Sequence, residues 1–205
     1  LLTFSRVESA ELDLSFQATD VHTLVNGAVR ALESLISRSD INLSIGLPDS
    51  PVSVLVDPFN FERVLINLIG NAIKFTTAGG EVRVEVSVIS GMVNFVVEDT
   101  GIGMSPEVVS QIFTPFYRAP EAARRQIQGT GLGMPIVQGI VRAHSGTILV
   151  ESEEGVGTTC SVSIPRLDDS EYPTLFDVEG SASMVGSGVG LPTRHDRPRV
   201  GDDPS

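Results

Sequence analysis

Four short stretches, in a fixed order along the chain, constrain its fold more than any other feature of the sequence. They are residues 67–74 (NLIGNAIK), 99–104 (DTGIGM), 113–116 (FTPF) and 129–134 (GTGLGM). Together they supply an amide oxygen suited to a hard metal ion, a lysine suited to phosphate, and a carboxylate suited to a nucleobase amine. Two glycine clusters flank one intervening segment. We therefore expect the four stretches to assemble a single nucleotide site.

The first stretch places polar side chains along one side of a predicted helix. Asn67, Asn71 and Lys74 follow one another at spacings of four and three residues, which share a helix face. Asn71 offers a side-chain carbonyl oxygen, which Mg²⁺ accepts alongside water and phosphate ligands. An isolated pair of asparagines would indicate only a solvated face, but Lys74, the single lysine of the chain, favours a phosphate site. Phe75 is expected either to flank the nucleotide or to join the core.

The second stretch carries a carboxylate at the end of a predicted strand. An ionised Asp99 accepts a hydrogen bond from the exocyclic amine of adenine and has no donor for the keto oxygen of guanine, so it selects ATP over GTP. Gly101 and Gly103 would let the backbone approach the base where a Cβ atom would clash. An ordinary Asp-x-Gly turn is the alternative interpretation of this stretch alone.

The last glycine cluster precedes a predicted helix, whose free N–H groups suit phosphate. Its residues are Gly129, Thr130, Gly131, Leu132 and Gly133. A dinucleotide-binding turn is excluded because its third glycine would fall at Met134 and because the preceding charged residues are not strand-like. A Walker A loop is excluded because the only lysine follows Ile73 and not a glycine.

Composition narrows the class of protein further. The net charge of −12 argues against a general binder of nucleic acid or of anionic membranes, since both require basic surface. Hydrophobic content of 41% is enough for a buried core. Cys160 is the single cysteine, so an intramolecular disulfide is impossible and a reducing cytoplasm is compatible. No apolar run approaches the roughly 20 residues that span a bilayer.

The remaining sequence alternates helix and strand patterns. Asp20 and Asp57 are expected helix N-caps, Pro58 suits a first helical position, and Gly146 is expected to end a helix. The patterns predict helices over residues 20–38 and 57–75, a short one from 105, and one over 135–145. They predict strands over residues 41–47, 52–56, 82–88, 93–98, 147–152 and 158–164.

These elements fall within residues 13–166, which we expect to form one domain. Residues 1–12 are typical of the last turns of a helix, so we interpret the chain as a fragment of a longer protein. Residues 167–205 lack apolar periodicity and are rich in Gly, Pro, Ser, Asp and Arg, a composition typical of disorder.

The order and spacing of the four stretches resemble the catalytic and ATP-binding domain of bacterial sensor histidine kinases, within the GHKL group of ATP-binding proteins. The resemblance runs from about residue 1 to about residue 165. It implies an α/β two-layer sandwich of Bergerat type, in which a mixed, mostly antiparallel sheet carries helices on one face. It also implies ATP and Mg²⁺ as cofactors, with Asn71 as the magnesium ligand and residues 1–12 as the end of a dimerisation helix.

By the same resemblance, residues 105–128 form a mobile ATP lid. Phe113 and Phe116 would anchor the closed lid, and Arg118 would reach the phosphates. Arg124 and Arg125 are candidates for the same role or for a solvated lid surface. Thr158 would contact adenine through water, or would be a plain strand threonine.

The position four residues before the metal-binding asparagine separates activities within the group. Members that hydrolyse ATP place a glutamate there, whereas this chain has Asn67, which cannot act as a base, and Glu62 lies too far along the helix. We therefore expect transfer of the γ-phosphoryl group to a protein histidine, with slow hydrolysis. None of the histidines, His22, His144 and His195, lies in the family's His-Glu/Asp-x-x-x-Pro motif, so the acceptor is expected on a separate dimerisation domain.

The implied partners are that histidine-bearing dimerisation domain of the same parent, a downstream response regulator, and a second copy in a parental homodimer, with no nucleic acid. The implied location is cytoplasmic, with a membrane anchor elsewhere in the parent compatible with the sequence. A serine kinase of the anti-sigma type and a non-catalytic ATP-dependent module are the alternatives, and residues 1–12 favour the histidine kinase.

Overall fold

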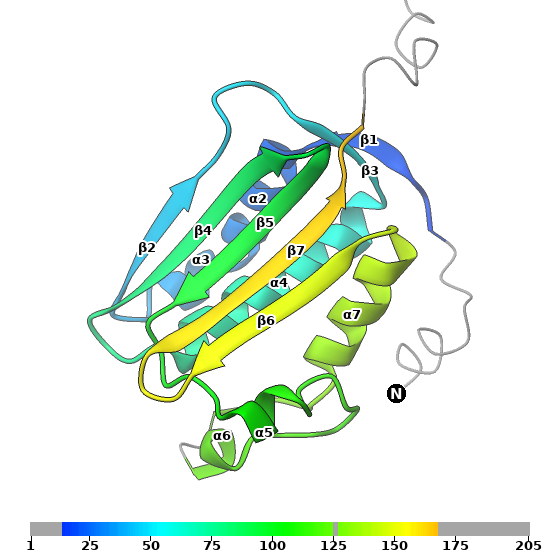
Figure 1. Ribbon diagram of the computed structural model, residues 1–205. Helices are drawn as coiled ribbons and strands as arrows, with labels where there is room; N and C mark the ends of the chain where they lie inside the picture. The colour runs from blue at the N-terminus through cyan, green and yellow to red at the C-terminus, as the bar shows by residue number, and fades with distance from the viewer. Residues whose placement is uncertain (1–13, 125–126, 168–205) are drawn as a thin grey trace, which may run out of the picture. The chain divides into compact units, whose positions relative to one another are not determined.

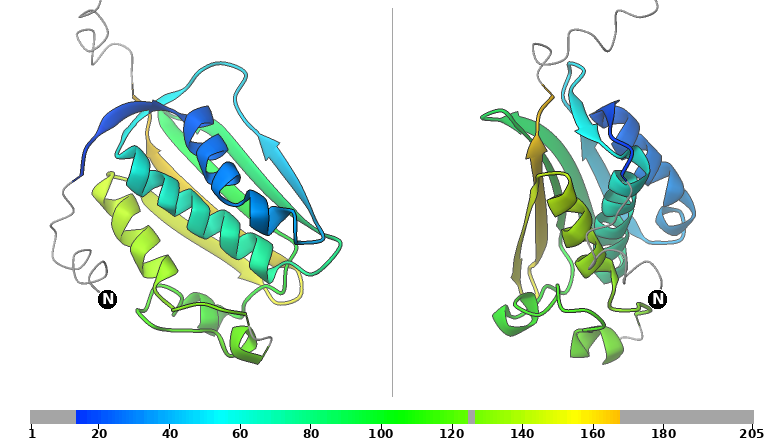
Figure 2. Two further views of the ribbon diagram at one scale, coloured as in Figure 1. Left: turned by 180° about the vertical axis from the view of Figure 1, so that it is seen from behind. Right: turned by 90° about the vertical axis from the view of Figure 1, so that its right-hand side faces the viewer.

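The computed structural model describes residues 14–124 and 127–167 of the chain. A five-stranded sheet in the order β2-β4-β5-β7-β6 carries helices α2, α4 and α7 on one face (Figure 1 and Figure 2). The strands are β1 (Gln17–Asp20), β2 (Ile41–Gly46), β3 (Ser53–Val56), β4 (Gly80–Ile89), β5 (Met92–Asp99), β6 (Thr147–Glu153) and β7 (Gly157–Pro165). The helices are α2 (Val21–Ala31), α3 (Glu33–Ile36), α4 (Pro58–Phe75), α5 (Pro106–Val109), α6 (Pro120–Arg124) and α7 (Gly133–Ala143).

The sheet is mixed and mostly antiparallel, as predicted. β2 pairs with β4 in parallel, whereas the β4–β5, β5–β7 and β6–β7 pairs are antiparallel. Alternate side chains of β4 and β5 turn towards the helices and are buried, namely Val82, Val84, Val86, Val93, Phe95 and Val97. The period-2 alternation of apolar residues along these strands therefore predicts which face of the sheet packs against the core.

Helix α4 lies in the middle of the helical layer, between α2 and α7 (Figure 2). Asp57 is its N-cap and accepts a hydrogen bond from Asn60 N at 2.8 Å, and Pro58 occupies the first turn, as predicted. Its buried side consists of Phe61, Val64, Leu65, Leu68, Ile69, Gly70, Ala72 and Ile73. Because α4 is fixed by both the sheet and its neighbouring helices, its opposite side holds polar residues in defined positions. No helix in the described ranges is long and apolar enough to cross a membrane.

His144 joins three parts of the fold. Its ring is buried, donates from Nδ1 to the Ile140 carbonyl at 2.8 Å, and accepts at Nε2 from the backbone N–H of Asp57 at 2.9 Å. Burial lowers the pKa of His144 and favours this neutral ring. Phe16 and Phe61 pack on the ring at centroid distances of 5.1 and 5.7 Å. The histidine is therefore structural.

The structure corrects several predicted boundaries. The helix predicted over 20–38 breaks at Leu32 (φ −98°, ψ 1°) into α2 and α3. The helix predicted over 135–145 runs from Gly133 to Ala143, with His144 as its C-cap, and Ser145 follows with φ 55° ahead of Gly146. β1 was not predicted, because its pairing with the distant β3 stabilises it and its own pattern does not.

Leu167, which the prediction assigned to the tail, is bonded to the described fold, since its backbone N–H donates to Ser53 O at 3.0 Å. The predictions for residues 1–12 and for 168–205 lie outside the described residues.

Candidate nucleotide-binding site

A cavity of about 1130 Å³ lies between α4, the loop that follows Asp99 at the end of β5, and the N-terminus of α7. Its lining draws together residues from the first, second and fourth predicted stretches and from the segments around them: Asn67, Asn71, Lys74, Phe75, Asp99, Gly101, Gly103, Arg118, Gly129, Thr130, Gly131, Gly133 and Thr158. Leu132, the N-cap residue of α7, lies outside this lining, and so do the predicted lid anchors Phe113 and Phe116.

One end of the cavity is built around Asp99 at the end of β5. The side chain is 8% exposed, and its Oδ1 accepts from the backbone N–H of Gly101 at 2.9 Å. Burial raises the pKa of Asp99 to about 6, against the lowering effect of the hydrogen bonds from Gly101 and Thr158. Thr158 faces Asp99 across the β5–β7 pair, and its Oγ1 lies 2.9 Å from Ser152 Oγ. A buried carboxylate with few partners is suited to a ligand amine.

The glycines that follow Asp99 bring loop backbone close to other elements. A Cβ atom on Gly101 would lie 2.5 Å from the carbonyl oxygen of Phe75, at the end of α4. Gly103 has φ 63°, and a Cβ atom there would lie 1.8 Å from Glu153 O. Larger residues would push this loop away from α4 and β6, so both glycines set the width of the Asp99 end.

The other end of the cavity is built from α4 and the start of α7. Asn67 Nδ2 donates to the carbonyl of Arg63 at 2.8 Å, and its Oδ1 is 2.9 Å from where a Cβ atom on Gly133 would stand. Asn71 Nδ2 contacts Met134 Sδ at 3.8 Å. The two asparagines therefore face the N-terminus of α7, where backbone N–H groups lack helical partners.

The amide oxygen of Asn71 fits a magnesium ion held mainly by a nucleotide. Its Nδ2 donates to Met134 Sδ, and its Oδ1 has no hydrogen bond among the described residues. Within residues 14–124 and 127–167 there is no group of three His, Cys, Asp or Glu side chains that could hold a metal by itself. Mg²⁺ bound through one protein oxygen together with phosphate and water matches this sparse donor set. Lys74, one turn on, is exposed and makes no ion pair among the described residues.

The segment predicted as a lid contains two short helices, α5 and α6. Ser105 caps α5 through a 3.4 Å hydrogen bond from Val108 N. Arg118 Nη2 donates to the Ile127 carbonyl at 2.6 Å, so the guanidinium links the two sides of α6. Arg124 pairs with Glu121 at 2.9 Å on the exposed surface, and Arg125 lies outside the described residues.

The two phenylalanines of the third stretch differ in environment. Phe113 is half-buried, whereas Phe116 is 57% exposed. Phe116 has φ 65°, and its N–H donates to Gly131 O at 2.9 Å, which ties the segment to the last glycine cluster.

The sequence interpretation missed the apolar floor of the cavity. Val97, Cys160 and Val150 occupy one row across β5, β7 and β6, and all three line the cavity. Burial, with a smaller effect of the Asp99 charge, raises the pKa of the Cys160 thiol to about 12, so it stays neutral. Each residue looked like ordinary strand core, and only the register between strands brings the three together.

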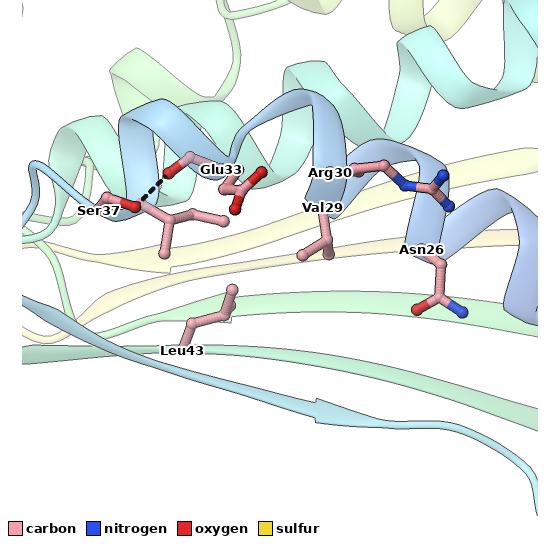
Figure 3. A pocket seen from close by; sticks show the side chains of 7 residues that line it. Asn26, Val29, Arg30, Glu33, Ser37 and Leu43 are labelled. Atoms are coloured by element: carbon pink, nitrogen blue, oxygen red, sulfur yellow. Dashed lines mark hydrogen bonds between the residues drawn. The ribbon is translucent and has the colours of Figure 1, made fainter.

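A second hollow, of about 500 Å³, lies between α2, α3 and β2. Figure 3 shows Val29 and Leu43 pointing towards one another across it, with Ser37 Oγ donating to the Glu33 carbonyl at 2.8 Å. None of the predicted site residues lines this hollow.

Comparison with known proteins agrees with this geometry. Residues 56–168 match the family model described as histidine kinase-, DNA gyrase B- and HSP90-like ATPase. Histidine protein kinase DivJ of Caulobacter vibrioides is 34% identical over 82% of this chain and 28% of its own length. Histidine kinase AdeS of Acinetobacter baumannii superposes with a TM-score of 0.66 at 28% identity, over 82% of this chain and 75% of that one.

Full-length ShkA, solved in complex with AMPPNP, superposes with a TM-score of 0.70 at 30% identity, over 80% of this chain and 34% of that one. The chain thus spans about a quarter of DivJ and a third of ShkA. The matched family segment covers more than half of the 205 residues. The chain therefore belongs to the histidine kinase-, DNA gyrase B- and HSP90-like ATPase family.

Proposed function

We propose that the chain binds Mg·ATP in the large cavity and donates the γ-phosphoryl group to a histidine on a dimerisation domain of the same parent protein. The observation that carries the proposal is the gathering of the predicted residues around one cavity, with a buried carboxylate at one end, asparagine amides and a helix N-terminus at the other, and Lys74 in the lining. The AMPPNP bound by ShkA, a structural neighbour, supports the choice of nucleotide.

Asp99 would select the base. Its ionised carboxylate accepts a hydrogen bond from the adenine amine, and guanine offers only an acceptor at that position. Gly101 and Gly103 let the loop after Asp99 pack closely on α4 and β6 beside the base, and Thr158 is the residue of β7 that pairs with Asp99. The apolar row formed by Val97, Cys160 and Val150 would cover one side of the ring.

The phosphates would lie between α4 and the N-terminus of α7. Mg²⁺, when bound through Asn71, would neutralise phosphate charge. Lys74 would add a compact positive charge, and the first N–H groups of α7 would donate to phosphate oxygens. Arg118 would exchange its hydrogen bond to the Ile127 carbonyl for one to phosphate.

Transfer is favoured over hydrolysis because no base faces the phosphate end from α4. Asn67 is an amide, and its Nδ2 is already committed to the Arg63 carbonyl. The carboxylate of Glu62 lies against α2, with its oxygens 3.0 and 3.1 Å from where a Cβ atom on Gly27 would stand. Water in the cavity would therefore be poorly activated, and ATP would wait for an acceptor.

The acceptor and further partners follow from the relatives, which are named as histidine kinases. We infer a histidine-bearing dimerisation domain, a parental homodimer, and a response regulator that receives the phosphoryl group. The names of these relatives do not favour the serine-kinase or non-catalytic alternatives.

A phosphotransfer assay tests the proposal. The chain is incubated with γ-labelled ATP, Mg²⁺ and the dimerisation domain of its parent as a separate polypeptide. Acid-labile, base-stable label should appear on that domain, and Asn71→Ala should abolish it by removing the magnesium ligand. Acid-stable label would indicate a serine kinase, and the absence of any transfer by the wild-type chain would refute kinase activity.

A further inference from the structure

The geometry gives the proposed nucleotide a direction along α4. At the base end, the Ile102 N–H donates to the carbonyl of Phe75, the last residue of α4, at 3.2 Å. At the phosphate end, Gly133 at the start of α7 lies against Asn67. A nucleotide with its base at Asp99 would therefore extend from the C-terminal end of α4 towards its N-terminal half, with the terminal phosphate nearest Asn67.

Arg63 is the next residue along this line. It precedes Asn67 by four residues, which places it on the same helix face and about 6 Å further along the axis. Its backbone carbonyl already orients Asn67 by accepting from Nδ2 at 2.8 Å. A phosphoryl group that leaves ADP in line with the phosphate chain would move from Asn67 towards Arg63.

The guanidinium of Arg63 is available for this encounter. Within the described part of the chain it makes one hydrogen bond, from Nη1 to Asn60 Oδ1 at a long 3.4 Å, and no ion pair. The adjacent Glu62 carboxylate is directed to Gly27 of α2 and does not neutralise it. Arg63 is thus half-buried and without an ion pair among the described residues, although the chain carries a net charge of −12.

We propose that Arg63 is a further catalytic residue, whose guanidinium binds the γ-phosphoryl oxygens while the group passes from ATP to the acceptor histidine. This role rests on the proposed function. In the transfer step the lone pair of an imidazole nitrogen forms the N–P bond as the bond from γ-phosphorus to the bridging oxygen breaks. The bridging electron pair leaves with ADP, and the proton of the other ring nitrogen passes to solvent. Arg63 stabilises the charge on the moving group.

Substitution of Arg63 separates this role from nucleotide binding. Single-turnover transfer to the separate dimerisation domain is measured at saturating ATP, and ATP affinity is measured by titration calorimetry. Arg63→Ala should slow transfer about 100-fold, the cost of losing one charged transition-state donor, with ATP affinity unchanged within about threefold. Arg63→Lys should recover part of the rate because it keeps the charge.

Arg83→Ala is the matched control, because Arg83 is an exposed arginine of β4 that pairs with Glu85. It should leave both the transfer rate and ATP affinity unchanged. A normal transfer rate in Arg63→Ala would overturn the role of Arg63 alone, and so would an equal loss of ATP affinity and rate. Failure of the wild-type chain to transfer at all would overturn the proposed function, and the role of Arg63 with it.

Discussion

At the scale of single residues, the burial of Asp99 lowers the stability of the folded domain at neutral pH. Burial raises the pKa of Asp99 to about 6, so the folded chain holds this proton more tightly than the unfolded chain does. The contribution of Asp99 to stability therefore falls as pH rises from about 4 to about 6, and the ionised carboxylate destabilises the nucleotide-free domain at neutral pH. A ligand amine would offset that cost, as the proposed role of Asp99 in binding requires.

Replacing Asp99 by Ala should weaken ATP binding about 10- to 150-fold, because a hydrogen bond to a charged group contributes roughly 1.5–3 kcal/mol. Titration calorimetry with ATP and GTP measures the loss, and only the wild-type chain should discriminate between the two nucleotides. Glu98→Ala is the control, since Glu98 is the exposed neighbour on β5. Equal wild-type affinity for both nucleotides would contradict the assignment.

The pH dependence of binding gives an independent measure of the same carboxylate. Because the proposed bond from the adenine amine requires the ionised form of Asp99, ATP affinity should fall as pH decreases through about 6, approaching tenfold per pH unit below it. The titration of ATP itself is removed by comparing wild type with Asp99→Asn at each pH. A difference between them that stays constant from pH 5 to 8 would show that Asp99 does not titrate in this range.

At the scale of elements, α4 and the two C-terminal strands could be predicted from the sequence. Asp57 and Pro58 indicate the start of α4, and apolar residues recur at helical spacing from there to Phe75. The same helical spacing predicts that Asn67 and Asn71 share one side of α4. These features are local, so a single stretch of sequence contains all the information that they need.

The features that could not be predicted depend on partners distant in sequence. β1 exists because Gln17–Asp20 pairs with β3, and β2 finds its parallel partner in β4 instead of in the strand that follows it. The break at Leu32 leaves both short helices packed on α4, where Leu32 reaches Gly70. The cavity floor likewise needs the register of β5, β7 and β6. Strand register is set by tertiary packing, which period-2 patterns do not encode.

The N-terminus of α4 is the element junction most sensitive to a single change. Asp57 caps α4 and also accepts from Ser15 N at 2.9 Å, while its own N–H donates to His144. Burial alone would raise the pKa of Asp57, but the hydrogen bonds from Asn60 and Ser15 leave it lowered. Asp57→Ala should reduce the free energy of unfolding by about 2 kcal/mol, through the lost cap and an unpaired Ser15 N–H. Urea denaturation measures the change.

Asp49→Ala is the control for Asp57→Ala, since Asp49 is exposed and makes no hydrogen bond among the described residues. It should change stability by less than about 0.5 kcal/mol. A similarly small effect of Asp57→Ala would show that the junction contributes little to the fold.

At the scale of the whole molecule, residues 168–205 should contribute little to stability or to nucleotide affinity, because they lack the apolar pattern that offsets the entropy of ordering. Truncation after Leu167 should shift the melting temperature by less than about 2 °C. Truncation after Ile164 should cost more, since it removes the backbone bonds from Arg166 to Gly91 and from Leu167 to Ser53. A loss of many degrees on the first truncation would show that the tail packs on the domain.

The final prediction concerns what the whole chain does without a partner. Incubated alone with γ-labelled ATP and Mg²⁺, it should gain no acid-labile, base-stable label, because phosphohistidine requires a presented imidazole. His144 is 4% exposed with both ring nitrogens hydrogen-bonded, and His22 Nδ1 is held 3.1 Å from Asp20 Oδ1.

His195 lies outside the described residues, and Asp196 follows it without a proline four positions later, so it lacks the acceptor motif. Phosphate release by the lone chain should also be slow, since Asn67 cannot activate water and Glu62 faces α2. Both are measured in one time course with labelled ATP, and His195→Ala serves as the check on the tail. Robust label that disappears in His195→Ala would place an acceptor within the chain, whereas rapid phosphate release would reveal a hydrolytic base that the geometry of α4 does not supply.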